Sequence, residues 1–230
     1  MIKLASLLVL TVGLASANTF IWATPAGSST GGEAVSASAT VVTGAGSITV
    51  TLNDLLANPT DVGQLISDFS FTLGSPLSTA LDTTSTPAGS LIYVSSPNTG
   101  DPIDPWNLTS TGATILLERL GATGTPSELI IGPGPYTNAN GSIAGNTPHN
   151  PFLDGTATFT FDVAGVTAGS TVTAATFSFG TTLGNDVPGT VCTGTDCGGG
   201  GLGGVPEPLS LFLMGGGLLG IGIFGKFRRA

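Results

Sequence analysis

Apolar residues alternate with Thr, Ser or Asp along four stretches of this 230-residue chain. In one of them Ile48, Val50 and Leu52 are apolar, and the two residues between them carry hydroxyl groups. A period of two predicts a β-strand with one buried and one solvated face, because successive side chains of a strand point to opposite sides. The four strands predicted in this way lie at residues 35–41, 48–52, 69–73 and 157–163.

Less regular patterns add four further elements. Short apolar runs predict strands at 91–95, 114–120 and 128–131. Residues 172–179 also alternate, but their apolar phase slips by one residue near Ala174 and Ala175. An extra residue that lets both halves of a strand face the core predicts a β-bulge. The one predicted helix is a short turn within 61–67, with Asp61 as its cap.

Clusters of Gly, Pro and Asn separate these stretches, and residues 96–105 and 132–151 form two longer segments without a strand pattern. Many short strands joined by Gly- and Pro-rich loops predict an all-β fold. We expect a single β-sandwich, jelly-roll-like, over residues 18–197, a length that suffices for one hydrophobic core. Long loops on a rigid sandwich are where a binding site is expected.

The N-terminus predicts a secretory signal peptide at residues 1–17. Lys3 precedes an apolar run at 4–14, and Ala15-Ser16-Ala17 follows it. A positive charge, an apolar run and small residues, in this order, predict cleavage after Ala17. The alternative is an uncleaved N-terminal helix, for which the apolar run is short compared with the thickness of a membrane.

The C-terminus combines three features. Val205-Pro206-Glu207-Pro208 is followed by seventeen uncharged residues, six of them Gly, and then by Lys226-Phe227-Arg228-Arg229-Ala230. The uncharged segment, 209–225, predicts a transmembrane helix of about 26 Å, slightly shorter than the ~30 Å hydrocarbon core and weakened by its Gly residues. Its basic end, residues 226–230 with Lys226, Arg228 and Arg229, would stay in the cytoplasm. The Gly-rich residues 198–204 predict a flexible linker in front of this tail.

The order of Pro206, Glu207 and Pro208, one apolar segment and a basic end resembles the PEP-CTERM sorting signal of exported bacterial proteins. The resemblance covers mainly residues 205–230. It implies that a membrane protease called exosortase processes the tail. It also implies an inner-membrane precursor in a Gram-negative bacterium, a final place at or beyond the cell surface, and a link to exopolysaccharide and biofilm. The alternative is an ordinary tail-anchored protein.

Charge excludes one class of partner. Between residues 18 and 204 the only basic residue is Arg119, whereas thirteen residues are acidic, which leaves a net charge of −12. Such a domain cannot neutralise phosphates, so we expect no nucleic acid partner.

Two cysteines, Cys192 and Cys197, bracket a four-residue turn. In an oxidising compartment this pair predicts a disulfide that closes a short loop just before the linker. One cysteine pair offers too few ligands for a metal site, and the only His lies more than forty residues away. No metal or other cofactor is predicted.

Few residues suit catalysis. His149 lies between two prolines, where it either caps a turn or acts as a base. Asp101 and Asp104 have the chemistry of a glycosidase pair, but Asp residues in turns usually bind the backbone. Trp106 is either a core residue or an exposed platform for a sugar ring. Trp106 and His149 are therefore candidate ligand contacts, and no catalytic residue is predicted.

Three functions follow from these observations. The first is a non-enzymatic surface or matrix protein, exported and processed at its tail. The second is a carbohydrate-binding module or lectin. The third, the weakest, is a secreted hydrolase, which the shortage of His, Cys and clustered acidic residues disfavours.

Overall fold

The computed structural model of the protein describes residues 17–121, 126–145 and 149–192. The predicted signal peptide up to Ser16, Cys197, the Gly-rich linker and the predicted sorting signal lie outside the described residues. Within the described ranges, no helix has the length and apolar character needed to cross a membrane.

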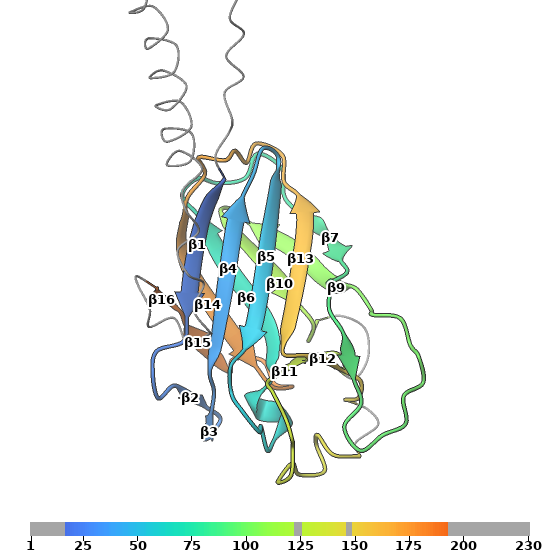
Figure 1. Ribbon diagram of the computed structural model, residues 1–230. Helices are drawn as coiled ribbons and strands as arrows, with labels where there is room; N and C mark the ends of the chain where they lie inside the picture. The colour runs from blue at the N-terminus through green and yellow to red at the C-terminus, as the bar shows by residue number, and fades with distance from the viewer. Residues whose placement is uncertain (1–16, 122–125, 146–148, 193–230) are drawn as a thin grey trace, which may run out of the picture. The chain divides into compact units, whose positions relative to one another are not determined.

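Five antiparallel strands form the first sheet, in the order β13-β5-β4-β1-β16 (Figure 1). They are β1 (Asn18–Ala23), β4 (Ala37–Thr43), β5 (Ser47–Asp54), β13 (Thr156–Asp162) and β16 (Thr190–Val191). Along β5, half-buried and buried residues alternate without exception. Ile48, Val50 and Leu52 are fully buried, which confirms the period-two prediction for this strand.

Nine strands form the second sheet, in the order β7-β9-β10-β6-β11-β12-β8, with β14 beside β6 and β15 beside β14. They are β6 (Ile66–Leu73), β7 (Asp82–Ser85), β8 (Leu91–Ile92), β9 (Trp106–Thr111), β10 (Thr114–Glu118), β11 (Ile130–Ile131), β12 (Phe152–Asp154), β14 (Val172–Phe179) and β15 (Asp186–Pro188). A separate two-stranded ribbon pairs β2 (Ser29–Thr30) with β3 (Glu33–Ala34).

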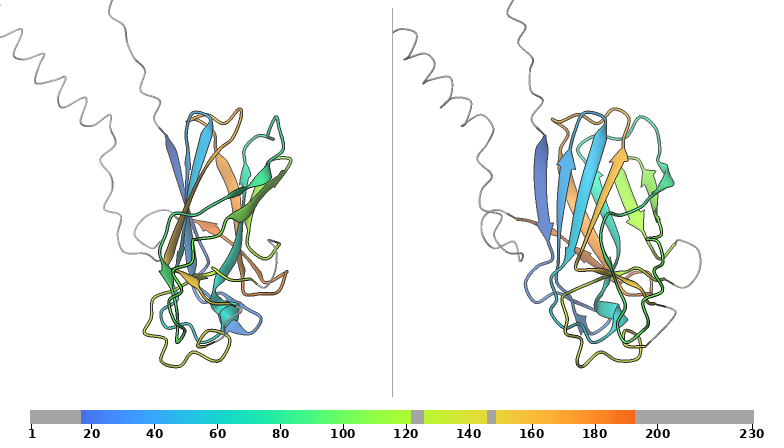
Figure 2. Two further views of the ribbon diagram at one scale, coloured as in Figure 1. Left: turned by 90° about the vertical axis from the view of Figure 1, so that its right-hand side faces the viewer. Right: turned by 45° about the vertical axis from the view of Figure 1, so that its right-hand side comes forward.

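The two sheets face each other across one hydrophobic core (Figure 2). Aromatic rings from both sheets fill it: Trp106 of β9 packs on Phe159 of β13 with ring centroids 5.1 Å apart. Phe69 of β6 and Phe177 of β14 pack at the same centroid distance. The all-β, sandwich-like fold predicted from the sequence is confirmed.

The predicted irregularity in β14 is confirmed one residue earlier than expected. The register of β14 against β6 shifts between Val172 and Ala174. Thr173 and Ala174 are both exposed, whereas Val172 and Ala175 are buried. The additional residue therefore lets both halves of the strand face the core, as the phase slip predicted, but Ala174 belongs to the outer face.

A second, smaller group of apolar side chains lies at the end of the sandwich where η1, the 3-10 turn Val62–Gln64, precedes β6. Ile143 in this group belongs to the long segment 132–151, and Val94 belongs to the predicted strand region 91–95 just before the other long segment. The segment 132–151 is therefore anchored by a buried residue rather than held at the surface alone. The fully or nearly fully buried members are Val62, Leu65, Val94, Leu129, Ile131, Ile143 and Phe152.

Candidate functional site

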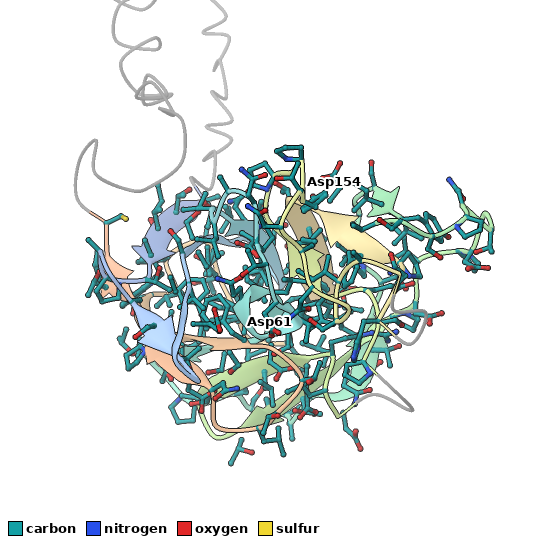
Figure 3. All side chains as sticks on the ribbon, turned by 90° about the horizontal axis from the view of Figure 1, so that it is seen from below. Asp61 and Asp154 are labelled. Carbon is teal, nitrogen blue, oxygen red and sulfur yellow. The ribbon has the colours of Figure 1, made fainter. Side chains whose placement is uncertain are left out.

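The long segment 132–151 and η1 meet at one end of the sandwich, which we call the loop end. Seen from below, Asp61 lies near the middle of this end and Asp154 lies towards one side (Figure 3). Asn140 Nδ2 donates a hydrogen bond of 2.5 Å to Asp61 Oδ2, and the backbone N–H of Asn140 donates to the carbonyl oxygen of Thr60. Ser142 Oγ accepts from the N–H of Val62 at 2.9 Å. The segment 132–151 is thus tied to the turn before β6.

Asp61 caps η1 as the sequence predicts. Its Oδ1 accepts the N–H of Gly63 at 2.7 Å, and the side chain of Gln64 accepts the N–H of Asp61 at 3.1 Å. This reciprocal arrangement is a capping box. Because Asp61 also accepts from Asn140, one carboxylate holds both the turn and the neighbouring loop.

We expect Asp61→Ala to lower the free energy of unfolding by about 1–2 kcal/mol, because it removes the cap and the loop contact together. Urea denaturation of the mature protein measures this change. Asp82→Ala removes an exposed carboxylate from β7 and is the matched control, with an expected change near zero. Equal losses in the two variants would contradict the assigned role of Asp61.

Arg119, the only basic residue of the described chain, is buried just beside the loop end. Its Nε donates to the carbonyl oxygen of Ser127 at 2.7 Å, and one terminal nitrogen donates to the carbonyl oxygen of Pro105 at 3.2 Å. The other terminal nitrogen lies 3.3 Å from Asp104 Oδ2 and 3.9 Å from Glu128 Oε2. Arg119 therefore joins the segment before β9 to the segment before β11.

Three buried carboxyl groups have raised pKa values. Burial raises the pKa of Glu128 to about 7, against the N–H of Asp104 and the charge of Arg119, which lower it. Burial raises the pKa of Asp68 to about 6, although the N–H groups of Leu120 and Arg119 donate to its carboxylate. Burial also raises the pKa of Asp54 well above its ordinary value.

Raised carboxyl pKa values are a signature of general acids, but also of structural networks. Every contact of Glu128 described above ties together parts of the chain: its carboxylate accepts the N–H of Asp104 at 2.8 Å and faces Arg119. Asp68 likewise accepts the backbone N–H of Arg119 at 2.7 Å. Both carboxyls therefore act as structural acceptors for loop segments.

Asp101 and Asp104, the residues with the chemistry of a glycosidase pair, have different partners. Asp104 pairs with Arg119. Asp101 accepts hydrogen bonds from Thr99 and, at 3.5 Å, from the hydroxyl of Tyr93. Each carboxylate is engaged by its own part of the loop, which favours the structural interpretation of this pair.

Of the two candidate ligand contacts, Trp106 is corrected to a core residue and His149 makes a structural contact. Trp106 is completely buried and packs on Phe159, so the prediction that its ring stacks on a sugar is wrong. The ring lies in the core because β9 places it on the inner face of the second sheet. His149 is half-buried, and its Nδ1 donates to the carbonyl oxygen of Pro126 at 2.8 Å. That contact matches the role of a loop residue that caps a turn.

Cys192 follows β16, and its N–H donates to the carbonyl oxygen of Ile21 at 2.9 Å. Its predicted partner, Cys197, lies outside the described residues, so the disulfide stays a prediction.

We expect the exported protein to be lighter than its reduced form by the mass of two thiol hydrogens, as mass spectrometry would show. Because the loop is short, Cys192→Ser should lower the stability only slightly. Alkylation of both thiols without a reductant would contradict the pairing.

A polar cleft of about 330 Å³ is also present, at the loop end, and the sequence patterns did not reveal it. It lies between the β2–β3 ribbon and the turn that joins β14 to β15, with η1 at its base. The residues that line it are Thr30, Gly31, Glu33, Asp61, Val62, Gly63, Thr181, Thr182 and Asn185.

A second cleft, of about 370 Å³, lies at the other end of the sandwich, between residues 73–78 and 164–171. Ser, Thr, Gly and aliphatic residues line it, and none of its lining residues is charged. Of the two clefts, only the one at the loop end carries charged groups and an amide. No protein-family model, curated protein or solved structure matches the chain, so a function has to be inferred from its own residues.

Proposed function

We propose that this chain is an exported surface or extracellular-matrix protein of a Gram-negative bacterium, sorted and processed through its C-terminal signal. In this proposal the signal peptide directs export, residues 209–225 hold the precursor briefly in the inner membrane, and exosortase processes the tail. The sandwich is then released or transferred to the cell surface, in association with exopolysaccharide or biofilm, and it has no enzymatic role.

The observation that carries the proposal is the order of motif, span and basic end in residues 205–230. Pro206 and Pro208 disfavour a helix upstream of the span, so the backbone around Glu207 is expected to be extended and to fit a protease cleft. A permanent anchor needs neither a Pro-flanked acid nor a helix with six Gly residues.

The folded domain is compatible with processing at its N-terminal end. Strand β1 begins at Asn18, the residue after the predicted cleavage position, and the N–H of Asn18 donates to the carbonyl oxygen of Ala168 at 3.1 Å. Cleavage after Ala17 would therefore leave the whole strand in place.

The finer fold assignment also belongs to the proposal: a jelly-roll-like ectodomain followed by one transmembrane helix.

Glu207→Ala is expected to leave membrane insertion intact, because Glu207 lies outside the apolar segment, and to make the full-length protein accumulate in the inner membrane. An immunoblot of membrane and extracellular fractions, with an epitope in residues 198–204, measures this. Asp82→Ala serves as the control that removes an acid from the sandwich and should be processed like the wild type.

Deleting residues 226–230 should instead disturb the membrane topology, because the basic residues set that topology.

The sorting proposal fails if the wild-type chain keeps its full length in the inner membrane of cells that possess an exosortase. The chain would then be an ordinary tail-anchored protein. Normal release of Glu207→Ala would also contradict the role assigned to the Pro-Glu-Pro motif.

A further inference from the structure

The cleft at the loop end is lined by polar side chains that the rest of the protein does not use. The side chains of Thr30, Glu33, Thr181, Thr182 and Asn185 make no hydrogen bond or ion pair within the described residues. Elsewhere at the loop end, polar side chains such as those of Gln64 and Asn140 are bonded to neighbouring loops. The cleft thus gathers hydroxyl, carboxylate and amide groups from two hairpins, all available to a ligand.

The charge of the cleft selects against anions. Glu33 and Asp61 are its only charged lining residues, and no basic residue lines it. Asp61 is engaged by Gly63 and Asn140, so Glu33 is the carboxylate open to a ligand. A carboxylate accepts hydrogen bonds from hydroxyl groups, whereas an acidic ligand would be repelled.

An exposed apolar residue belongs to the turn that supplies Thr181, Thr182 and Asn185 to the cleft. Leu183, in the turn between Thr182 and Asn185, is 75% exposed, the highest value among the large hydrophobic residues of the described chain. An amide and a carboxylate beside an aliphatic surface fit a ligand that has both hydroxyl groups and an apolar C–H face. Sugar rings combine these two properties.

We propose that this cleft binds a neutral polysaccharide. Glu33 and Asn185 hydrogen-bond to sugar hydroxyls, Thr30, Thr181 and Thr182 add hydroxyl contacts, and Leu183 packs against the C–H face of a ring. The volume of about 330 Å³ lies within the usual range of roughly 300–1,000 Å³ for small-ligand sites, so it suits a short segment of a longer chain. This site deepens the proposed link to exopolysaccharide and rests on the placement of the domain outside the cytoplasm.

Affinity electrophoresis tests the proposal with the full chain, in a detergent without a sugar headgroup. Gels contain a neutral glucan, mannan or galactan, or a polyuronate as the anionic comparison, and a chelator is present throughout. We expect retardation by at least one neutral polymer and none by the polyuronate.

Two substitutions at the cleft separate a specific site from general adhesion. Glu33→Gln and Asn185→Ala should each weaken the retardation by about tenfold. The first replaces a charged acceptor oxygen by an amide NH₂ group, and the second removes an amide that hydrogen-bonds to the ligand. Asp82→Asn, an equal change of charge on the far strand β7, should leave it unchanged. An unchanged thermal midpoint shows that each variant remains folded.

Several results would overturn the proposal: no retardation by any of the three neutral polymers, retardation that survives both cleft substitutions, or binding that appears only after calcium is added. The last result would mean that a cation, not a sugar hydroxyl, occupies Glu33. None of these outcomes affects the immunoblot for tail processing, so the two proposals fail independently.

Discussion

Arg119→Met is expected to lower the free energy of unfolding by about 3–5 kcal/mol at pH about 8. The change leaves a buried carboxylate without its counter-charge and two carbonyl oxygens without their hydrogen-bond donors. Glu128, only 2% exposed, would lose the positive charge that lies 3.9 Å from its carboxylate. The carbonyl oxygens of Ser127 and Pro105 would lose their donors. Urea denaturation of the mature protein measures the loss.

The dependence of this loss on pH identifies its cause. Below the pKa of about 7, Glu128 gains a proton and no longer needs a counter-charge. We therefore expect the loss to be smaller at pH about 5 than at pH about 8. Adding Glu128→Gln to Arg119→Met should recover part of the stability at pH about 8, because the unpaired carboxylate of Glu128 is then absent.

Arg119→Lys is the conservative comparison. Lysine keeps the charge but lacks the planar fork that reaches Ser127, Pro105 and Asp104 together, so we expect an intermediate loss. A loss below about 1 kcal/mol in Arg119→Met would contradict the structural role of this side chain, because surface ion pairs contribute no more than that.

Stability should fall as the pH rises from about 4 to about 7. The folded-state pKa values of Asp68, about 6, and Glu128, about 7, lie above the ordinary values of 3.8 and 4.5. Between these values the folded protein binds more protons than the unfolded chain, so each proton lost at higher pH destabilises the fold. The stabilisation is complete below the ordinary pKa and is lost as the pH rises through the folded-state pKa.

For these two groups we expect the free energy of unfolding to be about 2–4 kcal/mol larger at pH about 5 than at pH about 8. The buried carboxyl of Asp54, whose pKa is also raised, acts in the same direction. Thermal or urea denaturation across this range measures the profile. A flat or rising profile would contradict the raised pKa values.

Self-repulsion within an acidic domain also weakens at low pH, so variants must isolate the buried groups. Asp68→Asn keeps an acceptor for the N–H groups of Arg119 and Leu120, and Glu128→Gln keeps one for Asp104. Together these substitutions should remove most of the difference between the two pH values. Asp82→Asn, on the exposed strand β7, should leave the profile unchanged.

Local chemistry made several elements predictable. The alternation at 48–52 leaves one way to bury Ile48, Val50 and Leu52 on a single face, and β5 adopts it. Asp61 was predicted as a cap, and in the structure it caps η1 in a capping box with Gln64. The phase slip near Ala174 likewise marked the bulge of β14 to within one residue.

Strands with weak local patterns were missed or trimmed. Residues 91–95 contain only the two-residue strand β8, and 128–131 only β11. Strands β1 and β9, which supply Trp22 and Trp106 to the core, were not predicted at all. Their residues become strands because β4 and β10 offer edges for pairing, and pairing depends on contacts between distant parts of the chain.

By itself, the sequence determined the fold class, because a period of two over short runs allows little else. The charge of −12 between residues 18 and 204 also predicts that nucleic acid is not a partner. Only the tertiary structure decided where individual side chains lie and what they contact. Trp106 lies in the core, Arg119 pairs with Asp104 and Glu128, and the cleft forms between two hairpins. These outcomes depend on which distant segments pack together, and no local pattern of residues encodes that.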